Sequence, residues 1–357
     1  MAAFESVVGH APILTRLAAA ADRDELTHAI LLSGPDSVGK TTAASVLAAV
    51  LLAAEDWPGG PLAHPDLWLE DSDDEWLKIE RVRAGGRGES GVSLQDFLAL
   101  RPYAGGRRVA VMARADRLTE PAANSLLKTV EEPPEGTHLI LCAAHPERLP
   151  ATILSRCEIV TLAPVPVAAI AEWLRGVHGI EAETAATAAA LSAGRPGRAL
   201  HLAADESVLR AEVDALDRFV SIGGTGTVGA LRAATALNPG AGVEGRERAL
   251  MILAAWASFV RDASCFAAGA PELAIWSSYR PALERWAEAL PAGRIVDILG
   301  RLTEAADAVA INAQPRLAFE ALLLDIFAGP NSPPAVQPPA HAPAPTARPR
   351  GRRARGS

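Results

Sequence analysis

The stretch from residue 28 to residue 44 constrains the fold of this chain more than any other. Its apolar residues 29–32 predict a buried strand, and an alanine-rich helical pattern begins at Lys40. Between them the sequence reads Gly-Pro-Asp-Ser-Val-Gly-Lys-Thr, which matches the phosphate-binding pattern G-x-x-x-x-G-K-[ST] at every fixed position. A strand, a glycine-containing loop and a helix in this order predict a phosphate-binding loop.

The residue types in this loop fit the binding of a nucleotide. Glycines let successive backbone N–H groups turn toward phosphate oxygens, and the following helix favours an anion at its N-terminus. Lys40 can reach the β- and γ-phosphates, and the Thr41 hydroxyl can ligate Mg²⁺. The alternative is a glycine turn before a helix that carries Lys-Thr by chance, but the flanking strand and helix favour phosphate binding. We therefore expect ATP or ADP with Mg²⁺, weakly bound by Gly34, Pro35, Ser37, Val38, Gly39, Lys40, Thr41 and Thr42.

Composition places the chain among folded globular proteins. It has 357 residues, enough for two or three domains, and 49% of them are hydrophobic. Only 4% are aromatic, which argues against rows of base-stacking side chains. The net charge is −8, and five arginines but no acidic residue lie beyond residue 328. The rest of the chain is therefore still more acidic, which is not typical of a protein that binds nucleic acid by itself.

The cysteines and the apolar segments indicate a cytoplasmic protein. Cys142, Cys157 and Cys265 are far apart without metal-ligand spacing, as expected for reduced thiols. Residues 1–10 lack the layout of a signal peptide, and the apolar run at 43–54 is too short to span a bilayer. We expect no contact with a membrane.

Strands and helices alternate in the first part of the chain. The expected strands cover 29–32, 66–70, 108–113 and 138–143, and the expected helices cover 92–101 and 121–130. Pro133 and Pro134 end the second of these helices, because proline cannot continue it. This alternation predicts an α/β fold with a parallel sheet flanked by helices.

The pattern of strands ends near residue 163, and only helical periodicity follows. A break at 194–197 interrupts a set of short helices, and the residues after 328 are rich in Pro, Ala and Arg. We therefore expect an α/β domain at 1–163, a small helical domain at 164–205, an all-α domain at 206–328 and a disordered tail at 329–357.

Seven segments together resemble one known family. They are HAILLSGP at 28–35, HPDL at 64–67, RPYAGGRRVAV at 101–111, ADRLTEPAANSLLKTVEEPP at 115–134, LPATILSRC at 149–157, GRPGRAL at 194–200 and NAQPRLAFEALLLDI at 312–326. In this order they resemble the bacterial clamp-loader AAA+ family, and within it the δ′ subunits of DNA polymerase III. The SLLKTVEEPP and SRC segments are the most specific.

The resemblance implies an architecture and a set of partners. The expected fold is a AAA+ P-loop domain, a three-helix lid and a helical collar that assembles with four other subunits. Such a ring opens a sliding clamp and loads it onto primed DNA. The implied partners are the γ/τ and δ subunits and, through the assembly, the clamp and the primer–template DNA. The implied location is cytoplasmic and associated with the nucleoid.

Departures from the family's motor subunits predict nucleotide binding without hydrolysis. A Walker-B strand ends in Asp-Glu, but here the aligned strand is followed by Ala113 and Arg114. Asp116 lies beyond that position, and we expect it to cap the turn that follows it. Residues 142–144 replace a polar sensor with Cys-Ala-Ala, and Gly197 stands where motor subunits carry an arginine. The role of the neighbouring arginine at 198 stays open.

Many relatives also hold zinc with four cysteines that precede the HPDL segment. The corresponding residues 52–63 contain no cysteine, and His64 alone cannot supply a tetrahedral ligand set. We expect no zinc site, and we expect His64 to order its loop.

Arg156 in the SRC segment is the candidate catalytic residue. It could be an ordinary surface arginine, but the resemblance favours an arginine finger that acts in trans on the nucleotide of a neighbouring subunit.

Three functions remain for comparison. The first is a non-motor, δ′-like subunit, which binds ATP without hydrolysing it alone. The second is a γ/τ-like motor ATPase, which needs acids at the positions of Ala113 and Arg114. The third, ranked last, is a nucleic-acid-binding protein that acts through its arginine-rich tail.

Overall fold

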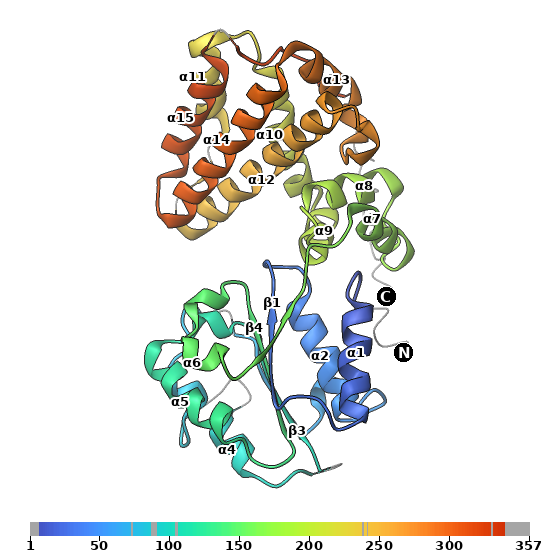
Figure 1. Cartoon of the computed structure of the whole chain (residues 1–357), viewed down its shortest axis with the longest axis vertical. Coiled ribbons are helices and arrows are strands. Elements are labelled where there is room, and N and C mark those ends of the chain that lie inside the picture. The colour runs from blue at the N-terminus through green and yellow to red at the C-terminus, as the bar shows by residue number, and fades with distance from the viewer. Residues whose placement is uncertain are drawn as a thin grey trace, which may run out of the picture. The chain divides into compact units, whose positions relative to one another are not determined.

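The computed structural model describes residues 7–72, 74–86, 91–103, 106–237, 239–240, 242–329 and 331–339. They fall into two compact units, which divide between Leu209 and Arg210. Figure 1 shows a sheet covered by helices in the first unit and helices alone in the second. Two residues of the RPYAGGRRVAV segment, at positions 104 and 105, lie outside the described residues.

The core of the first unit is a five-stranded sheet with the strand order β2-β3-β4-β1-β5. Every recorded strand pair is parallel, and β1 lies between β4 and β5. The strands are β1 Ala29–Ser33, β2 Leu67–Glu70, β3 Arg108–Met112, β4 Thr137–Ala143 and β5 Glu158–Thr161. All residues of β1 and β3 are buried, as their continuous apolar runs predict for a sheet covered on both faces. The predicted α/β class is confirmed.

Helices cover both faces of the sheet (Figure 1). Because side chains alternate along a strand, Ile30 and Leu32 pack with α1 and α2, while Ala29 and Leu31 pack with α4, α5 and α6. The helices are α1 Ala11–Asp22, α2 Lys40–Leu51, α3 Ile79–Val82, α4 Leu94–Ala99, α5 Glu120–Glu131 and α6 Ala151–Leu154. Short 3₁₀ turns lie at η2 Pro61–Ala63, η3 Ala115–Arg117 and η4 Pro146–Arg148.

Three short helices end the first unit. They are α7 Val167–Gly176, α8 Ala182–Leu191 and α9 Pro196–Ala204, and they pack on one another. Gly194 is the last residue of the turn after α8 and has φ of +78°, and a Cβ there would lie 2.6 Å from the Pro164 side chain. The prediction of helices with a break at this glycine is confirmed, whereas a separate domain at 164–205 stays a prediction.

The second unit is all-helical, as predicted. Its helices are α10 Glu206–Ser221, which begins just before the division, α11 Gly226–Leu237, α12 Gly242–Ala267, α13 Arg280–Ala289, α14 Ala292–Ile311 and α15 Pro315–Phe327, with 3₁₀ turns at η5 Pro271–Leu273 and η6 Ser277–Tyr279. Its centre is aromatic. The Phe219 ring stacks on Trp256 with 4.6 Å between centroids and lies 5.6 Å from Trp286.

The segment at 331–339 packs against the end of α10. The Val336 side chain is buried, and its backbone N–H donates to the carbonyl of Val220 at 3.3 Å. That carbonyl belongs to the last turn of the helix and has no partner within it, so the extended chain supplies one. Gly223 leaves room, since a Cβ there would lie 2.2 Å from the backbone of Pro334. The prediction of disorder is therefore wrong for 331–339, and residues 340–357 lie outside the described part.

Among the described residues, only α12 is long and apolar enough to cross a membrane, with a mean hydropathy of 1.4. Half of that apolar window is buried within the structure, as in the core helix of a helical unit.

Candidate nucleotide-binding site

The phosphate loop joins the carboxyl end of β1 to the first turn of α2. Gly34 has φ of +153°, and a Cβ there would lie 2.4 Å from the carbonyl oxygen of Leu162. Gly39 is the N-cap of α2 with φ of +110°. Both glycines are therefore required by the backbone path of the loop. Ser37, at its tip, also has a positive φ, +61°.

Lys40 lies inside this loop. Its side chain is only 7% exposed, and Nζ donates to the carbonyls of Gly34 at 2.8 Å and Pro35 at 2.9 Å. Burial lowers the pKa of Lys40, and the Asp36 carboxylate, 3.7 Å from Nζ, opposes this shift. An incoming phosphate could replace the two carbonyls, so the buried ammonium fits a nucleotide.

The other predicted loop residues lie around Lys40. Val38 is buried, Thr41 is half-buried in the first turn of α2, and Ser37 and Thr42 are exposed. Thr41 is the one predicted protein ligand for Mg²⁺ here. Magnesium sites in nucleotide-binding proteins usually add a carboxylate, and the strand β3 does not provide one.

Arg114 occupies the position after β3 where a motor subunit carries an acid. Its Nη1 donates to the carbonyl of Ser72 at 2.5 Å, and Nη2 lies 3.8 Å from the Asp71 carboxylate. Ala113, before it, is buried and apolar. The side chains of Ala113 and Arg114 therefore offer neither a Mg²⁺ ligand nor a base for the attacking water.

Asp116 caps a turn, but not the one that the sequence predicts. Its Oδ2 accepts the backbone N–H groups of Ala144 at 3.0 Å and His145 at 2.9 Å. The turn that it caps is the one after β4, rather than a turn in its own segment. The carboxylate thus fixes the loop that holds a polar sensor in motor subunits.

Two residues beside the loop were not predicted as part of the site. His10 is buried, and its Nε2 lies 3.1 Å from the carbonyl of Val38. Gly197, at the start of α9, donates its backbone N–H to the carbonyl of Ser37 at 2.9 Å, and a Cβ there would lie 3.2 Å from that oxygen. From the sequence, Gly197 was noted only because motor subunits carry an arginine at its position. It lies against the phosphate loop and has no side chain to offer a phosphate.

Two of the cysteines, Cys142 in β4 and Cys157 beside Arg156, are poor nucleophiles and poor metal ligands. Burial raises the pKa of the Cys142 thiol to about 12 and that of Cys157 to about 11, so both are protonated at neutral pH. Among the described residues, no group of three or more His, Cys, Asp or Glu side chains is placed to hold a metal ion. His64 orders its loop, as predicted: Nδ1 accepts the N–H of Asp66 at 3.1 Å, and the ring packs edge-on against Trp57.

Arg156 lies apart from the phosphate loop. It follows α6 and precedes β5, so it stands at the edge of the sheet where the parallel strands begin. The phosphate loop leaves the opposite edge, where β1 ends. A strand of five residues such as β1 is roughly 15 Å long. The structure therefore does not bring Arg156 together with the chain's own phosphate loop.

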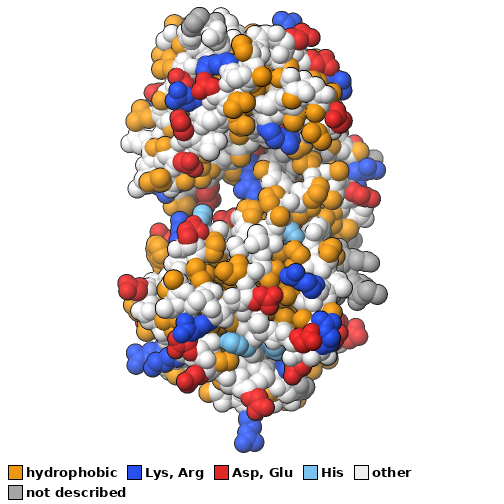
Figure 2. Space-filling view, viewed as in Figure 1, with side chains coloured by type: hydrophobic (Ala, Val, Ile, Leu, Met, Phe, Trp, Pro, Cys, Tyr) orange, Lys and Arg blue, Asp and Glu red, His pale blue; other side chains and the backbone are white. Residues whose placement is uncertain are grey.

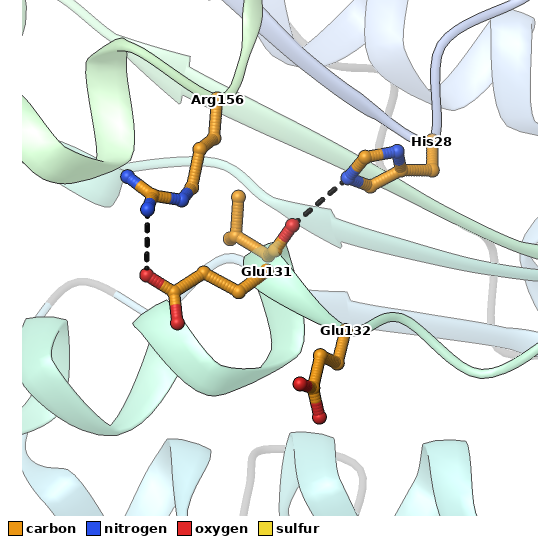
Figure 3. A pocket seen from close by; sticks show the side chains of 5 residues that line it. His28, Glu131, Glu132 and Arg156 are labelled. Carbon is orange, nitrogen blue, oxygen red and sulfur yellow. Dashed lines mark hydrogen bonds and ion pairs between the residues drawn. The ribbon is translucent and has the colours of Figure 1, made fainter.

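The Arg156 guanidinium is held by groups of its own chain (Figure 3). Nη2 lies 2.9 Å from Oε1 of Glu131, and Nη1 donates to the carbonyl of Thr152 at 3.0 Å and to the Ser155 hydroxyl at 3.4 Å. Arg156 lines an open hollow together with His28, Val130, Glu131 and Glu132. Its side chain remains 40% exposed.

Replacing His10 with glutamine should make the stability of the fold less sensitive to mild acid. Burial lowers the pKa of the His10 ring, although its bond to Val38 opposes this. The ring titrates near pH 6.5 in an unfolded chain, so acid protonates the unfolded state first. The contribution of the neutral ring is thus complete above about pH 6.5 and is lost as the pH falls below it. Glutamine can still donate to Val38 but does not titrate.

Urea denaturation at about pH 7.5 and about pH 5.5 measures the effect, and the wild-type midpoint should fall further than that of His10→Gln. Burial also lowers the pKa of His138, but this residue is present in both proteins and cancels. Equal losses in the two proteins would show that His10 is not the titrating group.

Part of the chain is similar in sequence to known proteins. Residues 9–166 match the model of a family described as DNA polymerase III, delta subunit. The DNA polymerase III subunit delta' of Haemophilus influenzae is 33% identical over 193 residues, which cover 53% of this chain and 59% of that protein. The DNA polymerase III subunit tau of Escherichia coli is 34% identical over 156 residues, 43% of this chain and 24% of that protein.

The chain thus spans less than two thirds of the length of either relative. A solved structure of a DNA polymerase III gamma-subunit-related protein from Thermotoga maritima aligns with 87% of this chain and 98% of its own, at 17% identity and a TM-score of 0.39.

Proposed function

We propose that this chain is a non-motor, δ′-like subunit of a clamp loader, because residues 9–166 match the model of the DNA polymerase III delta-subunit family. In this role it supports ATP-dependent loading of a sliding clamp onto primed DNA. Its direct partners are γ/τ and δ subunits, and it meets the clamp and the primer–template DNA through the assembly. One observation carries the non-motor assignment: the phosphate loop is intact, but Ala113 and Arg114 follow β3 where a motor subunit carries its acids.

The phosphate loop of this subunit binds ATP or ADP without hydrolysing it. The buried Lys40 ammonium and the two glycines with positive φ support binding of phosphate. Binding is weak, because Lys40 must first give up its bonds to the carbonyls of Gly34 and Pro35. Hydrolysis needs an acid that orients water, and the Arg114 side chain is instead bonded to Ser72.

The alternative is a γ/τ-like motor subunit, and the similarity to tau subunits is the observation that favours it. The same pair, Ala113 and Arg114, speaks against it. Hydrolysis by the isolated chain distinguishes the two.

A role in nucleic-acid binding through the arginine-rich tail has less support. The tail arginines lie beyond residue 339, outside the described part. Figure 2 shows Lys and Arg side chains interspersed with Asp and Glu on the visible face, without a broad basic patch. Binding of free DNA usually needs such a patch.

Arg156 acts in trans, on ATP bound by a neighbouring subunit. Arg156 lies at the end of the sheet opposite the chain's own phosphate loop, so its side chain cannot reach a nucleotide bound in that loop. This position supports a role at the nucleotide of another subunit. A planar guanidinium that is 40% exposed suits the stabilisation of charge on a transferring phosphoryl group.

Co-expression with γ/τ and δ subunits tests the assignment. We expect a stable complex to co-purify, and we expect the isolated chain to show no ATP turnover above background. The helices of residues 206–328 should carry the assembly, so removing 340–357 should leave it intact. The truncation must spare 331–339, because Val336 is part of the packing of the second unit. Failure of the full-length chain to join the complex would contradict the proposal.

A further inference from the structure

The ion pair between Arg156 and Glu131 joins two segments that are far apart in sequence, the end of α5 and the turn after α6. We propose that Glu131 is a positioning residue: its carboxylate fixes the plane of the Arg156 guanidinium so that the remaining donors face a phosphate of the neighbouring subunit's nucleotide. This inference rests on the proposed role of Arg156 in trans.

The donor count of the guanidinium allows this arrangement. A guanidinium carries five N–H donors, and the hydrogen bonds to Thr152 and Ser155 use the two of Nη1. The ion pair with Glu131 lies at Nη2, so Nε–H and at least one N–H of Nη2 are left for a bidentate contact with a phosphate. Arg156 therefore does not need to release Glu131 in order to act.

Glu131 is itself held in place. It is the last residue of α5, and the carbonyl of Val130 next to it lies 2.9 Å from Nε2 of His28. His28 directly precedes β1, so this bond ties the end of the helix to the central strand (Figure 3). Pro133 and Pro134 follow and stop the helix. The carboxylate thus projects from a fixed point.

Stability of the fold does not account for this pair. The side chains of Arg156 and Glu131 are 40% and 44% exposed, and ion pairs with this exposure contribute little to folding. Orientation is a better account, because an arginine fixed in advance loses less conformational entropy when it meets its phosphate.

Reconstituted complexes test the proposal through their clamp-dependent ATPase rate. In pre-steady-state measurements Glu131→Ala should slow hydrolysis about threefold at the site that Arg156 serves, at the lower end of couplings between contacting residues, and should leave KM for ATP unchanged. Glu131→Gln should recover most of the rate, since its amide oxygen can still accept from Nη2. Glu132→Gln is the matched control: Glu132 lines the same hollow but lies apart from the guanidinium in Figure 3, so the rate should not change.

A double variant separates positioning from folding. Glu131→Ala should have no further effect in a complex that already carries Arg156→Ala. The isolated Glu131→Ala chain should melt within about 3 °C of wild type. Suppose that Arg156→Ala slows ATP hydrolysis by the complex while Glu131→Ala leaves the rate unchanged or raises it. The positioning role of Glu131 would then be wrong, and the role of Arg156 as an arginine finger would still hold. If Arg156→Ala itself has no effect, both the finger and this inference are wrong.

Discussion

Replacing Arg156 with alanine should slow clamp-dependent ATP hydrolysis and clamp loading by the assembled complex, while this chain stays folded and assembled. An arginine finger is worth about 10³–10⁵ in rate at the site that it serves. The other sites of a ring keep their own fingers, so total turnover should fall by much less. Pre-steady-state ATPase measurements with the reconstituted complex should detect the slow site, because the amplitude of the initial burst of ATP hydrolysis should be smaller than in wild type.

Arg156→Lys should fail almost as badly. An ammonium is a point charge, and it cannot reproduce the planar fork that contacts Glu131 on one side and a phosphate on the other. Arg175→Ala, at an exposed arginine in α7, is the control for loss of a surface charge, and it should leave both rates unchanged. If the Arg156→Ala complex loads clamps at the wild-type rate, Arg156 is an ordinary surface residue and not an arginine finger.

The central strands could be predicted from sequence because burial on both faces leaves a plain apolar signature. The runs at 29–32 and 108–113 became β1 and β3 almost to the residue. The edge strand β5 gave no such signature: it has four residues, and Ile159 in it is 51% exposed. Its pairing with β1 defines it as a strand, and pairing is not visible in a local pattern.

The phosphate loop could be predicted for the same local reason, since one motif holds all its residues. The contacts that complete the site are not local. The bond from His10 to Val38 spans 28 residues, and that from Gly197 to Ser37 joins α9 to the loop. No periodicity connects such positions, so sequence patterns missed them.

The partner of Arg156 shows a similar limit. The segments around Glu131 and Arg156 were the most specific matches to the clamp-loader family, yet nothing in the sequence indicates that they touch. The contact arises because α5 and α6 pack on one face of the sheet.

The segment at 331–339 is the reverse case. Its proline-rich composition predicts disorder, but the chain bonds to the carbonyl of Val220 at the end of α10 and packs into the space above Gly223.

Replacing Lys40 with alanine should abolish nucleotide binding by the isolated chain. The ammonium provides charge-assisted hydrogen bonds to phosphate oxygens, and losing them should weaken affinity by about 100-fold or more. The fold should tolerate the change, because burial already disfavours the charged form of Lys40. Calorimetric titration with ADP and with a non-hydrolysable ATP analogue, each with Mg²⁺, measures the affinities of both proteins.

Lys78→Ala, at an exposed lysine beside α3, is the matched control and should bind nucleotide as wild type does.

The same protein preparations also test whether the chain hydrolyses ATP. Wild-type protein should bind nucleotide and release no phosphate, because Ala113 and Arg114 leave the attacking water without an orienting acid. Phosphate release that disappears in Lys40→Ala would mean that another group replaces the acid, and this chain would then be a motor subunit. Equal affinity in wild type and Lys40→Ala would instead mean that the phosphate loop is not the binding site.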